Sequence, residues 1–160
     1  MKRIIVLAAL LLTFISASAQ NGKSIYQKYS DYEGVSAVYI SPAMFRMIGK
    51  IPDLKVDSGD INLAPIIQSL SGLYIINSEN ETINKNLLSD VQKFIGSGQY
   101  ELLMEAKESG ETVRMYTMGT ETVVNGFVMV ASEPGETSFI YLDGKMNRDD
   151  LDKIFAEKMK

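Results

Sequence analysis

The spacing of apolar and polar residues changes once along the chain, near residue 100. Before that point apolar residues recur every three or four positions or form short runs, and after it they alternate with polar residues. A spacing of three and four places side chains on one face of a helix, whereas alternation places them on one face of a strand. The first part therefore predicts helices mixed with short strands, and the second part predicts consecutive strands.

Before residue 100 the pattern predicts four helices and two strands. Ser41-Pro42 begins one helix, because serine caps the free N–H groups and proline at the first helical position loses no hydrogen bond. Ser78-Glu79-Asn80-Glu81 matches a capping box and should begin the longest internal helix. Ile51–Asp60 is expected to be an exposed loop. The helices are expected over 23–32, 42–49 and 63–70 and from the capping box to Ile95, and the strands over 35–40 and 73–76.

From residue 100 onward four strands are predicted, joined by connectors short enough for antiparallel hairpins. Asn125-Gly126 usually marks a turn, but the apolar residues that follow favour a single strand with a bulge. Asp143-Gly144 is expected to end the sheet, and Asn147 to cap a last helix. That helix would bury Leu151, Ile154, Phe155 and Met159. The four strands are expected over 100–107, 112–118, 122–131 and 137–142.

This order of elements predicts an α+β fold with two layers. The sheet would be mostly antiparallel, a C-terminal four-stranded meander extended by the two N-terminal strands. The helices carry single apolar stripes, so they are expected to pack on one face of the sheet. Residues 20–160 contain no long linker and no repeat, and they are expected to form one domain.

Residues 1–19 read as a secretory signal peptide. Lys2 and Arg3 precede the apolar run Ile4–Ile15, and Ala17 and Ala19 supply the small residues that signal peptidase accepts. The run is shorter than the roughly twenty residues that cross a bilayer. The mature chain would therefore begin at Gln20, without a stable membrane anchor, and would be exported to the periplasm or the exterior.

The amino-acid composition excludes several kinds of catalytic and metal-binding site. The chain has no cysteine and no histidine, which excludes thiolate nucleophiles, disulfides, Ser-His-Asp triads and His-ligated metal sites. Loss of Lys2 and Arg3 with the signal peptide takes the formal net charge from −4 to −6. An acidic surface does not favour nucleic acid as a partner. No cofactor and no metal site is predicted.

Two groups of side chains are candidates for a functional role. Four tyrosines near the N-terminus could stack on a sugar or anchor a protein partner, or their rings could pack at the edge of the core. They are Tyr26, Tyr29, Tyr32 and Tyr39. Glu101 and Glu105 would lie on one strand face, but about 13 Å apart, which is longer than the carboxylate separations used in glycoside hydrolysis. They are better explained as a solvated face balanced by Lys107 and Arg114.

Several segments together resemble a known family. They are the signal peptide, the stretch from Tyr32 to Phe45, the sequence Gly72-Leu73-Tyr74-Ile75-Ile76 and the strand from Tyr100 to Lys107. In these the mature chain resembles the exported Bacteroidota proteins grouped as domain of unknown function 4252. The resemblance implies an exported α+β domain with no assigned catalytic residues, and it points to envelope signalling.

The leading hypothesis is therefore a non-enzymatic envelope module. It would bind an envelope protein or another macromolecule, such as a glycan, through its sheet or a helix groove. The alternative hypothesis is a small hydrolase or a glycan-binding domain built on carboxylates and tyrosines. A flat apolar patch beside an open sheet edge would favour the binding module.

Overall fold

The computed structural model describes residues 21–48 and 64–150. The predicted signal peptide and its cleavage site, the loop predicted over 51–60 and the body of the last predicted helix lie outside these residues. The described elements are α2 (Gly22–Tyr29), β1 (Val35–Ile40), α3 (Pro42–Ile48), α4 (Ala64–Ser69), β2 (Leu70–Ser78), α5 (Glu81–Ser97), β3 (Tyr100–Glu108), β4 (Glu111–Gly119), β5 (Val123–Glu133) and β6 (Glu136–Asn147).

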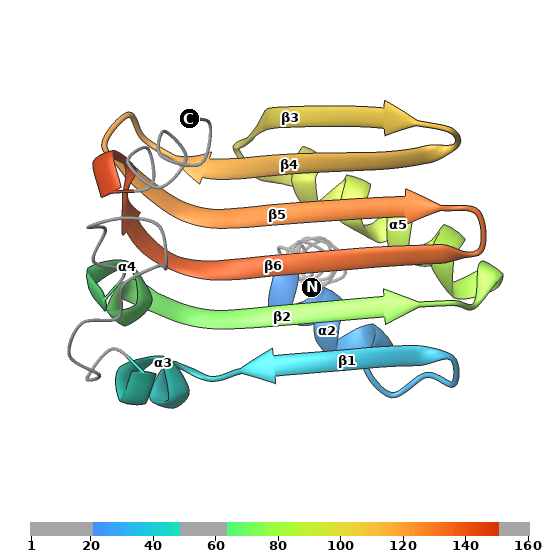
Figure 1. Ribbon diagram of the computed structural model, residues 1–160, viewed down its shortest axis with the longest axis horizontal. Coiled ribbons are helices and arrows are strands. Elements are labelled where there is room, and N and C mark those ends of the chain that lie inside the picture. The colour runs from blue at the N-terminus through green and yellow to red at the C-terminus, as the bar shows by residue number, and fades with distance from the viewer. Residues whose placement is uncertain (1–20, 49–63, 151–160) are drawn as a thin grey trace, which may run out of the picture.

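The described strands form one six-stranded sheet in the order β1-β2-β6-β5-β4-β3, and every neighbouring pair is antiparallel (Figure 1). The four strands after residue 100 are consecutive neighbours, as their short connectors predict. Strand β2 adds to the free side of β6, and β1 forms the edge. The predicted α+β fold with an antiparallel meander is confirmed.

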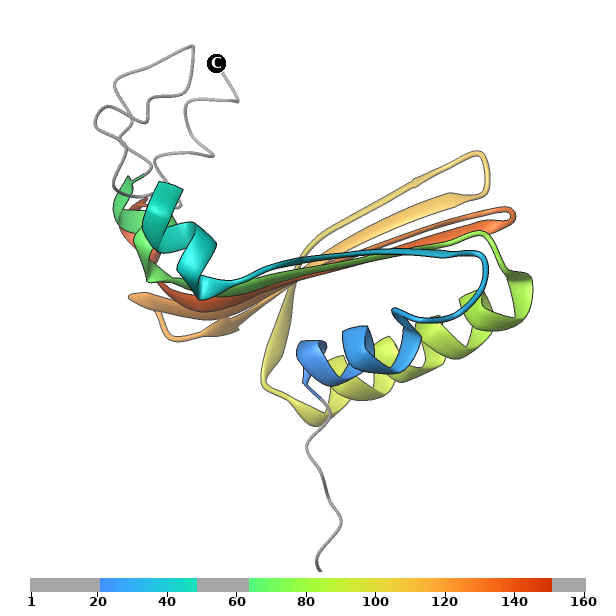
Figure 2. The same cartoon turned by 90° about the horizontal axis from the view of Figure 1, so that it is seen from below.

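Helices α2 and α5 cover one face of this sheet, and we call it the covered face (Figure 2). Their apolar stripes meet inward strand residues such as Ile76, Val128 and Phe139, which are all fully buried. Helices α3 and α4 lie at one end of the opposite side (Figure 2). There Ile66 of α4 packs with Val124 and Met146 in a second, smaller cluster.

The first turn of each long helix is capped by asparagine. The side chain of Asn21 accepts a hydrogen bond from the backbone N–H of Ser24 and completes a capping box at α2. The side chain of Asn80 accepts from the backbone N–H groups of Thr82 and Ile83 at α5. The predicted capping box at Ser78 is wrong, because β2 continues through Ser78 and the helix begins three residues later. At α3, Ser41 and Pro42 hold the predicted positions.

Strand β5 is irregular at Asn125, and the neighbouring strand β6 is irregular at Gly144. The predicted bulge at Asn125 is confirmed by the pairing with β4, where the neighbours Met118 and Gly119 pair with Gly126 and Val124 and leave Asn125 as the extra residue. The predicted end of the sheet at Asp143-Gly144 is wrong, because β6 runs on to Asn147. Gly144 is not in a turn here. Its backbone, at φ +155°, lies against β2, where a Cβ would be 2.7 Å from the carbonyl oxygen of Ser69. The side chain of Asn147 then accepts a hydrogen bond from the backbone N–H of Asp149, as a cap should.

Candidate functional site

The structure divides the four predicted tyrosines into two groups. Tyr29 is buried in the core under α5, and Tyr32, beside it with ring centroids 6.0 Å apart, is 52% exposed. Tyr26 and Tyr39 instead contact each other and Tyr74, and the rings of Tyr39 and Tyr74 stack 4.9 Å apart. Tyr39 is 46% exposed at the β1 edge. The exposed rings available to a partner are therefore those of Tyr32 and Tyr39.

The Tyr29 hydroxyl is engaged inside the protein. It donates a hydrogen bond of 2.8 Å to Oδ2 of Asp90 on α5, and Lys28 Nζ lies 2.5 Å from the same oxygen. Lys93 Nζ is 3.5 Å from the other carboxylate oxygen. Burial alone would raise the pKa of Asp90, but the hydrogen bonds from Lys28 and Tyr29 outweigh it and hold that pKa below its ordinary value. Burial, together with the carboxylate, raises the pKa of Tyr29 to about 12.

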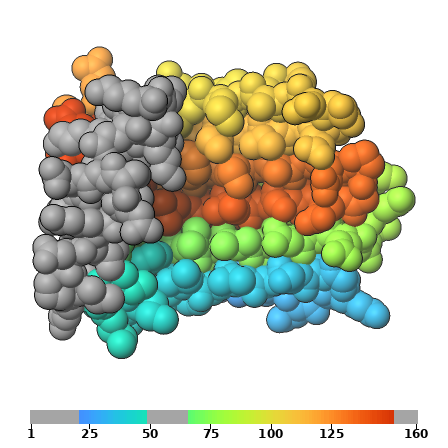
Figure 3. Space-filling model, viewed as in Figure 1, coloured from blue at the N-terminus to red at the C-terminus, as the bar shows by residue number. Residues whose placement is uncertain are grey.

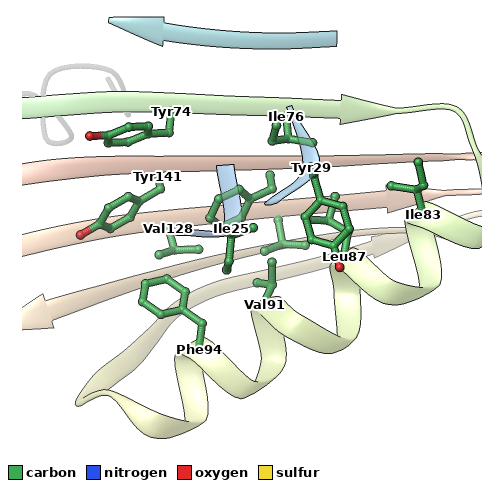
Figure 4. Packing of buried hydrophobic residues seen from close by; sticks show 12 residues of the cluster. Ile25, Tyr29, Tyr74, Ile76, Ile83, Leu87, Val91, Phe94, Val128 and Tyr141 are labelled. Carbon is green, nitrogen blue, oxygen red and sulfur yellow. The ribbon is translucent and has the colours of Figure 1, made fainter. Parts of the chain in front are cut away.

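Further tyrosines continue across the covered face, and sequence reasoning did not single them out. Tyr74 stacks on Tyr141, and Phe94 meets Tyr141 edge-on (Figure 4). Phe94 also meets Tyr100 edge-on. Burial raises the pKa of the phenols of Tyr74, Tyr100 and Tyr141, that of Tyr74 to about 12. A Cβ at Gly72 would lie 2.7 Å from the Tyr74 ring. Gly72 lies two residues before Tyr74 on the same strand and the same face, and this spacing was the available signal.

The carboxylate pair considered for hydrolysis does not form. A bulge between Leu102 and Met104 inserts one extra residue into β3. Glu101 therefore pairs with Thr117 and Glu105 with Arg114, which point to opposite faces of the sheet. Glu105 binds Arg114 and Lys107 at 2.5 and 2.7 Å, as the charge pattern predicts.

The face opposite α2 and α5, which we call the open face, carries one complete row of apolar side chains. The strand register places one residue of every strand in this row, from one sheet edge to the other. The row consists of Val38, Ile75, Ile140, Met129, Met115 and Met104. Its two ends, Val38 and Met104, are 44% and 43% exposed, and the four inner side chains are half-buried by their neighbours.

The rows on either side of this central row differ in polarity, so the two ends of the open face differ chemically. Toward α3 and α4 the next row is apolar on four strands, with Ile40, Leu73, Leu142 and Phe127, and polar on the other two, with Thr117 and Glu101. On the other side the next row is mostly small or polar and consists of Ser36, Asn77, Ser138, Ala131, Val113 and Ala106. Beyond it, where the hairpins turn, the paired residues are all acidic: Glu136 with Glu133, and Glu111 with Glu108. Four carboxylates therefore collect at one end of a largely apolar surface.

Figure 3 looks onto this face. Side chains of the six strands follow one another across it, and away from α3 and α4 none of the described helices lies above them. At the acidic end the surface is hollowed. One hollow of about 200 Å³ is bounded by Glu111, Glu133 and Glu136, and a second of about 380 Å³ is bounded by Glu79 and Glu136. Both hollows are open to solvent at the hairpin end.

Two further features, a metal site and a membrane-spanning helix, are absent from the described residues. Within 21–48 and 64–150, no group of three or more acidic, histidine or cysteine side chains is arranged to hold a metal ion. Over the same residues no helix has the length and apolar character needed to cross a membrane.

Comparison with known proteins gives one match. A family model described as "Domain of unknown function (DUF4252)" matches residues 29–154. This range includes every described strand and α3, α4 and α5. No curated protein and no solved structure matches the chain.

Proposed function

The chain belongs to the DUF4252 family, and from this premise we propose that it is a non-enzymatic binding module of the cell envelope that holds a protein partner on the open face of its sheet. The family description names no activity, so the proposal rests on the surface of this chain. The predicted signal peptide supports a place in the envelope.

The observation that carries the proposal is the apolar row from Val38 to Met104. Neighbouring strands lie about 4.8 Å apart, so six strands span about 24 Å, and the complete row together with the four apolar positions of the next row covers on the order of 300 Å². Apolar patches of this size on a protein surface are often functional, because leaving them in water costs free energy that a partner recovers. A sheet face that only met solvent would carry polar side chains at these positions.

Capture from an envelope extract of the source organism tests this proposal. Met129→Lys places a charge at the centre of the row and should remove the proteins that the wild-type chain captures. Leu102→Lys is the matched control, because Leu102 is 50% exposed on β3 but faces the other side of the sheet. Equal capture by the wild type and Met129→Lys, with equal thermal stability, contradicts the proposal.

A second candidate function is glycan binding at Tyr39. Its ring is about half exposed and is held by stacking on Tyr74, and a fixed aromatic ring can stack on a sugar. Tyr39→Ala should then abolish binding to an array of envelope glycans, whereas Tyr29→Phe, at a buried ring, should not change it. If no glycan is retained by the wild-type protein, this second function is wrong.

A further inference from the structure

The acidic end of the open face indicates the chemistry of the partner. Resting on the proposed function, we infer that the open face binds a polypeptide whose apolar surface is bordered on one side by lysines or arginines. The apolar rows would take the apolar surface, and the glutamates of the hairpin end would take the cations.

The four glutamates at this end have no partner within the part of the chain that the structure describes. Glu108, Glu111, Glu133 and Glu136 form no ion pair there. Glu105, on the covered face of the same sheet, has two cationic partners. Among the described residues no cation competes for these four carboxylates, and a partner's cation can meet them.

The spacing of the rows suits a lysine or arginine side chain. Successive rows on one face are about 6.7 Å apart, so the acidic row lies about 13 Å from the central apolar row. The row between them contains small residues such as Ser138, Ala131 and Ala106. The aliphatic stem of a lysine can lie over such a row while its ammonium group reaches the carboxylates.

Charge disfavours two other occupants. The chain has a formal net charge of −4, and a second copy would bring its own acidic row into the interface. An anionic membrane would likewise meet the glutamates with charge of the same sign. A cationic border on the partner is the arrangement that complements this end of the face.

Three synthetic amphipathic helical peptides of equal length test the inference with the full mature chain. The first has an apolar face with lysines along one flank, the second has glutamates in place of those lysines, and the third keeps the lysines but has serines on the apolar face. Calorimetry should detect binding of the first peptide alone, and its affinity should fall as salt is added.

Charge-reversed variants connect that binding to the acidic end. Glu133→Lys with Glu136→Lys should weaken binding of the first peptide by about tenfold or more, because attractive contacts become repulsive. Glu121→Lys with Asp149→Lys changes the net charge equally at exposed positions near the opposite end of β5 and β6, and should leave the affinity unchanged. Met129→Lys should abolish binding.

The outcomes separate the two proposals. If Met129→Lys abolishes binding but the Glu133 and Glu136 reversals do not weaken it, the face binds a partner and the inferred cationic border is wrong. If Met129→Lys has no effect, the proposed function itself fails. A dimer in sedimentation that Met129→Lys dissociates, or binding to phosphatidylcholine vesicles containing phosphatidylglycerol, assigns the face to another occupant and overturns the inference.

Discussion

Three side chains, those of Lys28, Tyr29 and Lys93, meet the carboxylate of Asp90 between α2 and α5. Asp90 is only 7% exposed, and a buried carboxylate is tolerated only when hydrogen bonds and opposite charge replace its water. The cluster joins the two helices of the covered face by polar contacts, beside the apolar core that they share. The sequence made Tyr29 a candidate for partner contact, but its side chain is buried and its hydroxyl binds Asp90 in this cluster.

Stability should depend on pH through Asp90. Its pKa is lowered in the folded protein, so the unfolded chain binds a proton first as the pH falls. The stabilisation is therefore complete above the ordinary value of 3.8 and is lost as the pH drops through the lower folded pKa. Asp90→Asn should cost about 1 to 3 kcal/mol at neutral pH and much less near about pH 2. Urea unfolding across this range measures the difference.

Lys93→Ala is the control for that experiment. Lys93 is 68% exposed and lies 3.5 Å from Asp90, so its removal should cost less than about 0.5 kcal/mol. Unfolding curves of Asp90→Asn that stay parallel to those of the wild type from neutral to acid pH would rule out this role for Asp90.

At the scale of the element, β6 continues beside β2 through Asp143-Gly144, a sequence that usually marks a turn. Gly144 has no side chain, and this lets the backbone of β6 approach Ser69 and Leu70 where β2 is irregular. The strand therefore continues for three more residues and pairs Met146 with Val124. That pairing places both side chains in the small cluster under α4.

Gly144→Ala should destabilise the protein by about 2 kcal/mol, because a Cβ would lie 2.7 and 2.8 Å from backbone atoms of Ser69 and Leu70. Gly96→Ala is the opposite case, since nothing lies within 4 Å of a Cβ at this helical position. It should stabilise the protein by about 0.5 to 1 kcal/mol. Thermal unfolding compares the two, and equal midpoints would contradict this account of Gly144.

Adjacent isoleucines on β2 face opposite sides of the sheet. Ile76 is completely buried under α2 and α5, whereas Ile75 lies in the apolar row of the open face. Ile76→Ala should cost about 2 to 5 kcal/mol, and Ile75→Ala about 1 kcal/mol. Denaturant unfolding measures both, and a loss at Ile75 as large as that at Ile76 would mean that the open face is covered in the folded protein.

At the scale of the whole molecule, the described long helices α2 and α5 both lie on the same face of the sheet. Helices α2 and α5 supply the main core without a disulfide, because the chain has no cysteine. The side of the sheet opposite them joins an apolar surface to an acidic end. Those two properties are the basis of the binding role proposed for it.

Much of this architecture follows from local patterns. The α+β class, the four consecutive strands, the start of α3 and the bulge at Asn125 were predictable because each depends on a few neighbouring residues. The capping residue of α5 was misplaced because a serine that can cap a helix can equally end a strand. The positions of Glu101 and Glu105 were misjudged because the bulge between them inverts the alternation of faces.

The sequence by itself determined which residues alternate along each strand and which helices carry an apolar stripe, because both are properties of a single element. Only the tertiary structure decided which face of the sheet those helices cover. In runs such as Phe127 to Val130 both alternating sets are apolar, so the period of two does not distinguish the core from the open face. The apolar row and the acidic end exist only when register brings six separate strands into line.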